Sequence, residues 1–226
     1  MKVIAIIPSG GLGMRVNTPL PKQYLKSKGK EIIAHTLDIF QKSDFIDEII
    51  IAAQKDFFYL LEEIKLKYSI SKVINIIEGG QERQNSVFNA LKSISSGNGN
   101  LVVVHDAVRP LLPQYILNNA IESAKKYGST VVAVKTQDTL INGNEFVQSY
   151  IDRNEIYFAQ TPQVFPYEIL FEAMNKAEND KFIGTDESII VHRLGYKVRI
   201  VEGSSINFKI TTIDDIKLFN ILSEHN

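Results

Sequence analysis

Apolar side chains follow one another along the sequence in two patterns, and these patterns predict alternating strands and helices. Short, mainly apolar runs predict strands at residues 3–7, 46–52, 73–77, 101–104, 130–134 and 197–201, the third of them buried. Apolar residues spaced three and four positions apart predict helices at residues 31–41, 57–68, 82–94, 113–127, 167–177, 186–194 and 213–222. Strands that alternate with helices favour an α/β fold with a parallel sheet and right-handed crossovers.

Several residues are suited to the ends of these helices. Pro113 fits the first position of a helix, and Gly128 fits the position after its last turn. Thr185 is expected to cap the helix that follows it, and either Thr211 or Thr212 is expected to cap the last helix.

The alternation stops after Val134, and residues 135–160 are mostly polar. Asn142-Gly143 is typical of a tight hairpin turn between two short strands. An isolated two-stranded hairpin is only marginally stable in water, so we expect this one to pack on another surface. A second subunit is one candidate for that surface.

The loop after the first strand contains Gly10, Gly11 and Gly13, followed by the cations Arg15 and Lys22. Glycine lets the backbone approach a ligand closely, and successive N–H groups can form a concave anion site. The sequence lacks the third glycine of a Rossmann fingerprint and the Gly-Lys-Ser/Thr of a Walker A loop. Two alternatives stay open, a polyphosphate site and an ordinary turn from strand to helix.

Three stretches follow directly after predicted strands: residues 8–22, 79–86 and 106–109. Open α/β sheets bind ligands beyond the carboxyl ends of their strands, and parallel strands place all these ends at one edge. The sequence therefore predicts one site built from all three stretches.

Composition narrows the classes of function. The 226 residues are 44% hydrophobic and 23% charged, and the net charge of −1 gives no global attraction to nucleic acid. The absence of cysteine excludes disulfides, thiol nucleophiles and thiolate metal sites, and the four histidines have no zinc-ligand spacing. No apolar run has transmembrane length and the first is too short for a signal peptide, so we expect a soluble, cytoplasmic protein.

Any anion site must come from a local cluster of cations. Such cations stand in or beside loops and element ends: Arg15, Lys22, Arg83, Arg109, Arg153 and Lys209. Several of them at one sheet edge favour phosphoryl or nucleotidyl transfer, which depends on positioning and charge neutralisation. Asp106 is then a magnesium ligand or a ribose contact, or else simply a helix cap or the partner of Arg109. His105 is expected to be a packed histidine at a strand end.

Motifs carry a family resemblance from about Ile4 to Thr212. They are, in order, PSGGLGMR with PLPKQYL, GGQERQNSV, VHDAVRP, QDT, DRN, QTPQVF, TDES and NFKITT. The set resembles the 2-C-methyl-D-erythritol 4-phosphate cytidylyltransferases of non-mevalonate isoprenoid biosynthesis. It is also similar to the ribitol-5-phosphate cytidylyltransferases.

The resemblance implies a single Rossmann-like α/β nucleotidyltransferase domain over residues 1–226, with a mostly parallel sheet. It also implies a projecting β-arm, at about residues 136–158, that embraces the partner in a homodimer. The implied CTP-binding residues are Ser9, Gly10, Gly11, Gly13, Gly80, Gln81, Arg83, Ser86, Asp106 and Ala107. The implied catalytic cations are Arg15 and Lys22, with Asp106 near a magnesium ion. The implied residues for the acceptor phosphate and its pocket are Arg109, Thr139, Arg153, Thr161, Thr185 and Lys209.

The expected reaction is transfer of CMP from CTP to 2-C-methyl-D-erythritol 4-phosphate, without nucleic acid or membrane as partner. Ser9-Gly10-Gly11 stands where these enzymes usually have Ala-Ala-Gly, which leans toward the ribitol type, and many relatives have an acidic residue at Gln81. The DRN motif, Ala107 and TDES favour the methylerythritol type. The alternatives are a ribitol-5-phosphate cytidylyltransferase that makes CDP-ribitol and an inactive nucleotide-binding regulator.

Overall fold

The computed structural model of the chain describes residues 1–11, 20–95 and 97–223. Over these residues a central β-sheet contains seven strands in the order β11-β7-β10-β6-β1-β4-β5. Neighbouring strands are parallel except at β10, which pairs antiparallel with both β6 and β7. The strands are β1 (Val3–Ser9), β4 (Glu48–Ala53), β5 (Val73–Glu78), β6 (Leu101–Val104), β7 (Thr130–Lys135), β10 (Tyr157–Pro166) and β11 (Arg199–Glu202). The predicted α/β fold with a mostly parallel sheet is confirmed.

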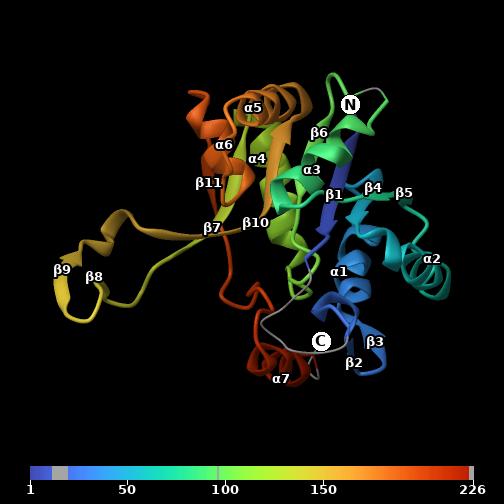
Figure 1. Cartoon of the computed structure of the whole chain (residues 1–226), viewed down its shortest axis with the longest axis horizontal. Helices are drawn as coiled ribbons and strands as arrows, with labels where there is room; N and C mark the ends of the chain where they lie inside the picture. Colours follow the sequence, from blue (N-terminus) through green and yellow to red (C-terminus); the bar gives the residue numbers. More distant parts are fainter. Residues whose placement is uncertain (12–19, 96, 224–226) are drawn as a thin grey trace.

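Helices cover both faces of this sheet (Figure 1). Alternate residues of β1 point to opposite faces, so that Ala5 and Ile7 belong to one core cluster and Ile4 and Ile6 to the other. One face packs on α1 (Ile32–Gln41), α2 (Phe58–Lys67) and α4 (Gln114–Tyr127), and the other on α3 (Arg83–Lys92), α5 (Tyr167–Asn179) and α6 (Glu187–Arg193). Coverage on both faces explains the uninterrupted apolar run of this strand.

A smaller cluster closes one end of the fold, where the last helix, α7 (Ile213–Leu222), packs Phe219 against Ile32, Val108 and Ile210. The remaining short elements are η2 (Lys22–Tyr24), β2 (Lys26–Ser27), β3 (Lys30–Glu31), η3 (Lys55–Phe57) and η4 (Arg153–Glu155). None of the helices in the described ranges is long and apolar enough to cross a membrane.

Two features of the sheet differ from the sequence predictions. The strand at residues 73–77 is not buried, because β5 is an edge strand with a neighbour on one side only, and Ile74 is 55% exposed. The sequence pattern missed β10 altogether, because Gln160, Thr161 and Gln163 interrupt its apolar residues although all three are buried.

The helix ends also correct the predicted caps. Asp186, not Thr185, caps α6, since its carboxylate accepts a hydrogen bond from the N–H of Ile189 at 3.0 Å. Pro113 is the N-cap of α4, one position earlier than predicted. Gly128 ends α4 with φ of +89°, and Thr212 caps α7, as the sequence indicated.

The polar segment after β7 forms a hairpin that projects from the sheet (Figure 1). Its strands, β8 (Leu140–Gly143) and β9 (Val147–Ile151), make a separate two-stranded sheet. The turn lies at residues 144–146 and not at Asn142-Gly143, because a register shift pairs Gly143 with Val147. Phe146 and Tyr150 are highly exposed on this arm. The partner surface predicted for them stays a prediction.

Candidate active site

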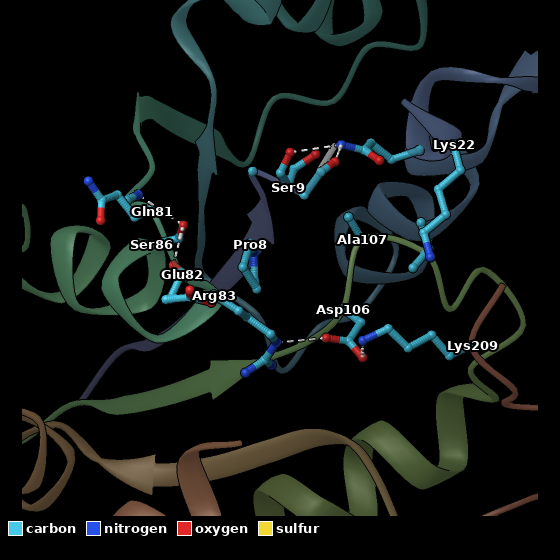
Figure 2. A pocket seen from close by; sticks show the side chains of 15 residues that line it. Pro8, Ser9, Lys22, Gln81, Glu82, Arg83, Ser86, Asp106, Ala107 and Lys209 are labelled. Carbon is cyan, nitrogen blue, oxygen red and sulfur yellow. Dashed lines mark hydrogen bonds and ion pairs between the residues drawn. The ribbon is translucent and has the colours of Figure 1, made fainter. Parts of the chain in front are cut away.

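A pocket of about 480 Å³ lies at the carboxyl ends of β1, β5 and β6 (Figure 2). Its walls come from the loop after β1, the start of α3, the residues after β6 and the segment before α7. The predicted site residues that line it are Ser9, Gly10, Gly11, Lys22, Gly80, Gln81, Arg83, Ser86, Asp106, Ala107 and Lys209. The predicted convergence of the three loops is therefore confirmed.

Two glutamines hold the backbone of the loop after β1. The Gln23 amide donates hydrogen bonds to the carbonyl oxygens of Ser9 and Gly11 at 2.9 and 3.0 Å. The Gln54 amide donates to the carbonyl of Gly10 at 3.0 Å. The described part of the loop, residues 9–11, is thus held by the protein itself, which lowers the entropy that this part loses when a ligand binds to it. Sequence reasoning missed both glutamines, although Gln23 lies within the PLPKQYL motif.

Glycine is required for packing at the second wall of the pocket. A Cβ atom on Gly80 would lie 2.2 Å from Cβ of Asn85, and one on Gly79 would lie 2.9 Å from Oγ of Ser86. The Ser86 hydroxyl also accepts a hydrogen bond from the N–H of Gly80 at 3.0 Å. In contrast, a Cβ atom on Gly11 would meet no heavy atom of the described residues within 4 Å. The first turn of α3 therefore packs directly on the glycines that follow β5.

Asp106 is the electrostatic centre of the site. Its Oδ1 accepts from Nε of Arg83 at 3.0 Å, and its Oδ2 lies 3.1 Å from Nζ of Lys209 (Figure 2). The same Oδ2 lies 3.2 Å from Nε of Arg109. Burial acts to raise the pKa of this carboxyl group, but the charges of Arg83, Lys209 and Arg109 outweigh burial and hold the pKa far below its ordinary value. Asp106 is therefore both a partner of Arg109 and part of the pocket wall.

Arg83 is held from its other side by Glu187, the first residue of α6. Nη1 of Arg83 donates to both carboxylate oxygens of Glu187 at 2.7 and 2.8 Å, and the carboxylate is fully buried. Burial raises the pKa of Glu187, and the ion pair with Arg83 acts in the opposite direction. The guanidinium group therefore lies between two carboxylates, with Nε facing Asp106 and Nη1 facing Glu187. Sequence reasoning did not single out Glu187, whose signal was its place in the TDES motif.

His105 and Thr161 support Asp106 from behind. The Thr161 hydroxyl accepts from the N–H of Asp106 at 3.1 Å and lies 3.0 Å from Nδ1 of His105. Nε2 of His105 lies 3.1 Å from the carbonyl oxygen of Arg109, which can only accept, so we assign the ring proton to Nε2. The Thr161 hydroxyl then donates to Nδ1. Burial lowers the pKa of His105 to about 4, which keeps the ring neutral.

Comparisons with known proteins identify the family of the chain. The family model of 2-C-methyl-D-erythritol 4-phosphate cytidylyltransferase (IspD) matches residues 3–224. The chain belongs to this family. A relative of that name from Clostridium acetobutylicum is 40% identical, with 98% of this chain and 97% of the relative covered. Another from Syntrophus aciditrophicus is also 40% identical, with 96% and 94% covered.

Solved structures of family members have the same fold. The 4-diphosphocytidyl-2C-methyl-D-erythritol synthase of Anaerococcus prevotii superposes with a TM-score of 0.86 at 29% identity, covering 99% of this chain and 98% of that one. The 2-C-methyl-D-erythritol 4-phosphate cytidylyltransferase of Francisella tularensis gives a TM-score of 0.83 at 30% identity, covering 98% and 99%.

Some residues that the family resemblance implied lie outside the pocket wall. Thr161 is buried behind Asp106, and Arg109 lies there as well, with a second hydrogen bond to the carbonyl of Asn207 at 2.7 Å. Thr185 is exposed on the loop before α6. Thr139 and Arg153 are exposed on the arm, where Arg153 donates to the carbonyl of Gln137. Gly13 and Arg15 are outside the described residues.

The donor groups of the pocket are compatible with a divalent metal ion whose ligands come mostly from the phosphates of the substrate. In the described parts of the chain, no group of three or more His, Cys, Asp or Glu side chains could hold a metal ion together. Asp106 could supply one oxygen, which matches the usual binding of Mg²⁺ by one or two carboxylates plus substrate phosphates. The family's need for a divalent metal is thus compatible with this pocket.

Proposed function

We propose that the chain transfers CMP from CTP to 2-C-methyl-D-erythritol 4-phosphate in non-mevalonate isoprenoid biosynthesis. A phosphate oxygen of the acceptor attacks the α-phosphorus of CTP and forms a new P–O bond. The bond from that phosphorus to the oxygen bridging to the β-phosphate breaks, and pyrophosphate leaves with the electron pair. The product is 4-diphosphocytidyl-2-C-methyl-D-erythritol. The observation that carries this proposal is one pocket in which Ser9, Gly10 and Gly11, the start of α3 and an Asp106-centred cation cluster meet.

On the nucleotide side, the backbone of Ser9, Gly10 and Gly11 would bind the phosphates and the base of CTP. Gly80, Gln81 and Ser86, with Ala107 opposite, would hold the cytidine. Lys22 lines the pocket and, with Arg15, would neutralise charge that develops at the α-phosphorus, which is the kind of electrostatic stabilisation that dominates such transfers. Gly13 would complete the loop.

On the acceptor side, Lys209 faces the pocket next to Asp106 and would bind the acceptor phosphate. Thr139 and Arg153 are exposed on the projecting arm, and we propose that they reach the pocket of a partner subunit in a homodimer. Thr185 would border the same acceptor pocket, whereas Arg109 and Thr161 would act by holding Asp106. The cytoplasmic location and the single domain over residues 1–226 stay predictions.

Asp106 is the residue that would hold Mg²⁺, and the ion would add positive charge beside the triphosphate. The chain's own contribution is separate from it. Arg83 and Arg109 fix the Asp106 carboxylate in its ionised form.

Pyrophosphate release, measured with CTP, UTP, ATP and GTP against both methylerythritol phosphate and ribitol 5-phosphate, tests the proposal. We expect turnover with CTP and methylerythritol phosphate, dependent on a divalent cation and abolished by a chelator. Turnover with ribitol 5-phosphate alone would overturn the acceptor. CTP binding without turnover on either acceptor would instead favour a regulator.

A further inference from the structure

Among the described residues, the fully buried carboxylate of Glu187 has Arg83 as its only partner. The two residues are 104 positions apart in the sequence. Such a carboxylate is unfavourable unless its charge is compensated, so its position needs an explanation beyond packing. It does not line the pocket and is not needed to cap α6, because Asp186 does so.

The start of α6 is fixed against the start of α3 and against β10. The Gln84 side chain accepts from the N–H of Gly184 at 2.8 Å and donates to the carbonyl of Phe182 at 3.0 Å. Gln163 of β10 accepts from the N–H of Ser188 at 2.9 Å. These bonds flank Glu187 on both sides along the chain. The carboxylate is thus presented to Arg83 by a rigid framework rather than by a flexible loop.

The two carboxylates determine the direction of the Arg83 guanidinium. Nη1 is used by Glu187 and Nε by Asp106, while Nη2 is buried and has no hydrogen-bond partner within the described residues. A buried unpaired nitrogen is unfavourable, so the bonds from Nε and Nη1 to the two carboxylates must hold the guanidinium there although Nη2 stays unpaired. The Arg83 side chain is 27% exposed on the pocket side, and without Glu187 it could turn toward the nucleotide.

We propose that Glu187 is a positioning residue for the transfer reaction: it holds Arg83 against Asp106, so that Asp106 keeps its place and Lys209 stays available for phosphate. This inference rests on the proposed function. Glu187 touches neither substrate and acts only through Arg83. Its contribution therefore depends on the presence of the arginine side chain.

A double-mutant cycle on the whole protein tests this dependence, with variants E187Q, R83Q and R83Q/E187Q. We expect E187Q to lower kcat/KM for CTP by roughly 10- to 100-fold, since misplacement of a site by about 1 Å can lower a rate by about 10²-fold. In the R83Q background the same change should alter kcat/KM by less than about threefold, because the two residues act as one unit. Equal losses in both backgrounds, or none in either, would overturn the proposal.

The matched control is E31Q. Glu31 is also a buried glutamate, which accepts from the Tyr68 hydroxyl at 2.8 Å away from the pocket, and E31Q should retain wild-type kcat/KM. If E187Q lowers the temperature of thermal unfolding, the variant R83Q/E187Q separates a loss of stability from a loss of positioning, because it removes the charges of both Arg83 and Glu187. Restored stability with kcat/KM still low supports positioning, whereas restored kcat/KM contradicts it.

Failure of the proposed function would look different. Wild-type protein without turnover on either acceptor refutes the reaction, and the cycle is then measured as CTP affinity by calorimetry. The same non-additivity in affinity still supports the role of Glu187, and additive or absent effects contradict it.

Discussion

Acidification should destabilise the fold through His105, by an amount that the structure allows to be worked out. The ring is fully buried, its Nε2 proton is directed at the Arg109 carbonyl, and burial lowers its pKa from 6.5 to about 4. At a pH between these two pKa values, the histidine is protonated in the unfolded chain but stays neutral in the folded chain. The stability contributed by neutral His105 is therefore complete above the unfolded pKa and is lost as the pH falls toward the folded pKa. From about pH 7 to about pH 5 the loss is about 2 kcal/mol.

Urea unfolding of wild type and H105Q, at one protein concentration and at both pH values, measures this loss. H105Q should be less stable than wild type near neutrality, because glutamine lacks the ring that packs on Phe40. Its stability should fall by about 2 kcal/mol less than that of wild type on acidification. H192Q, a change at an exposed histidine, controls for the substitution itself. If wild type and H105Q lose the same stability, the argument for a buried neutral ring is refuted.

Two further predictions concern the pocket and the arm. Gly80→Ala should lower the unfolding free energy by about 1–3 kcal/mol, because its Cβ would lie 2.2 Å from that of Asn85. Scanning calorimetry of both variants and wild type measures this, and Gly11→Ala should have the melting temperature of wild type. Equal melting temperatures of the two variants would contradict the prediction for Gly80. If arms act in trans, mixing inactive Lys22→Ala and Arg153→Ala dimers should restore roughly a quarter of all sites after random exchange. No recovery, despite exchange shown by sedimentation of labelled subunits, would mean that the arm works in cis.

The sequence alone determined the elements whose ends are set by local signals. The strand at 101–104 and the helix at 213–222 have the predicted ends, since a run of apolar residues and a threonine cap are local signals. The place of the pocket also followed from the sequence, because parallel strands bring their carboxyl ends to one edge whatever the details of the loops.

Strand β10 needed the tertiary structure. Its buried polar residues are satisfied by groups far away in sequence: Gln160 donates to the carbonyl of Ser204 at 2.9 Å and accepts from Asn207 at 3.1 Å, and Gln163 accepts from Ser188. A pattern of hydrophobic and polar positions cannot distinguish a buried polar side chain with such partners from an exposed one. The hairpin turn was displaced for a related reason, because the pairing of Gly143 with Val147 depends on the register of both strands.

The same division holds for the site. The sequence identified three of the pocket's stretches by their place after strands, and the family resemblance implied the individual lining residues from Ser9 to Lys209. Only the folded chain decided that Arg83 points at Asp106, because that direction depends on Glu187 at the start of another helix. It likewise decided that Thr161 lies behind the pocket. Residue type and position in the chain specify which groups are near a site, whereas the direction of each group depends on charges and hydrogen bonds from elements that only folding brings together.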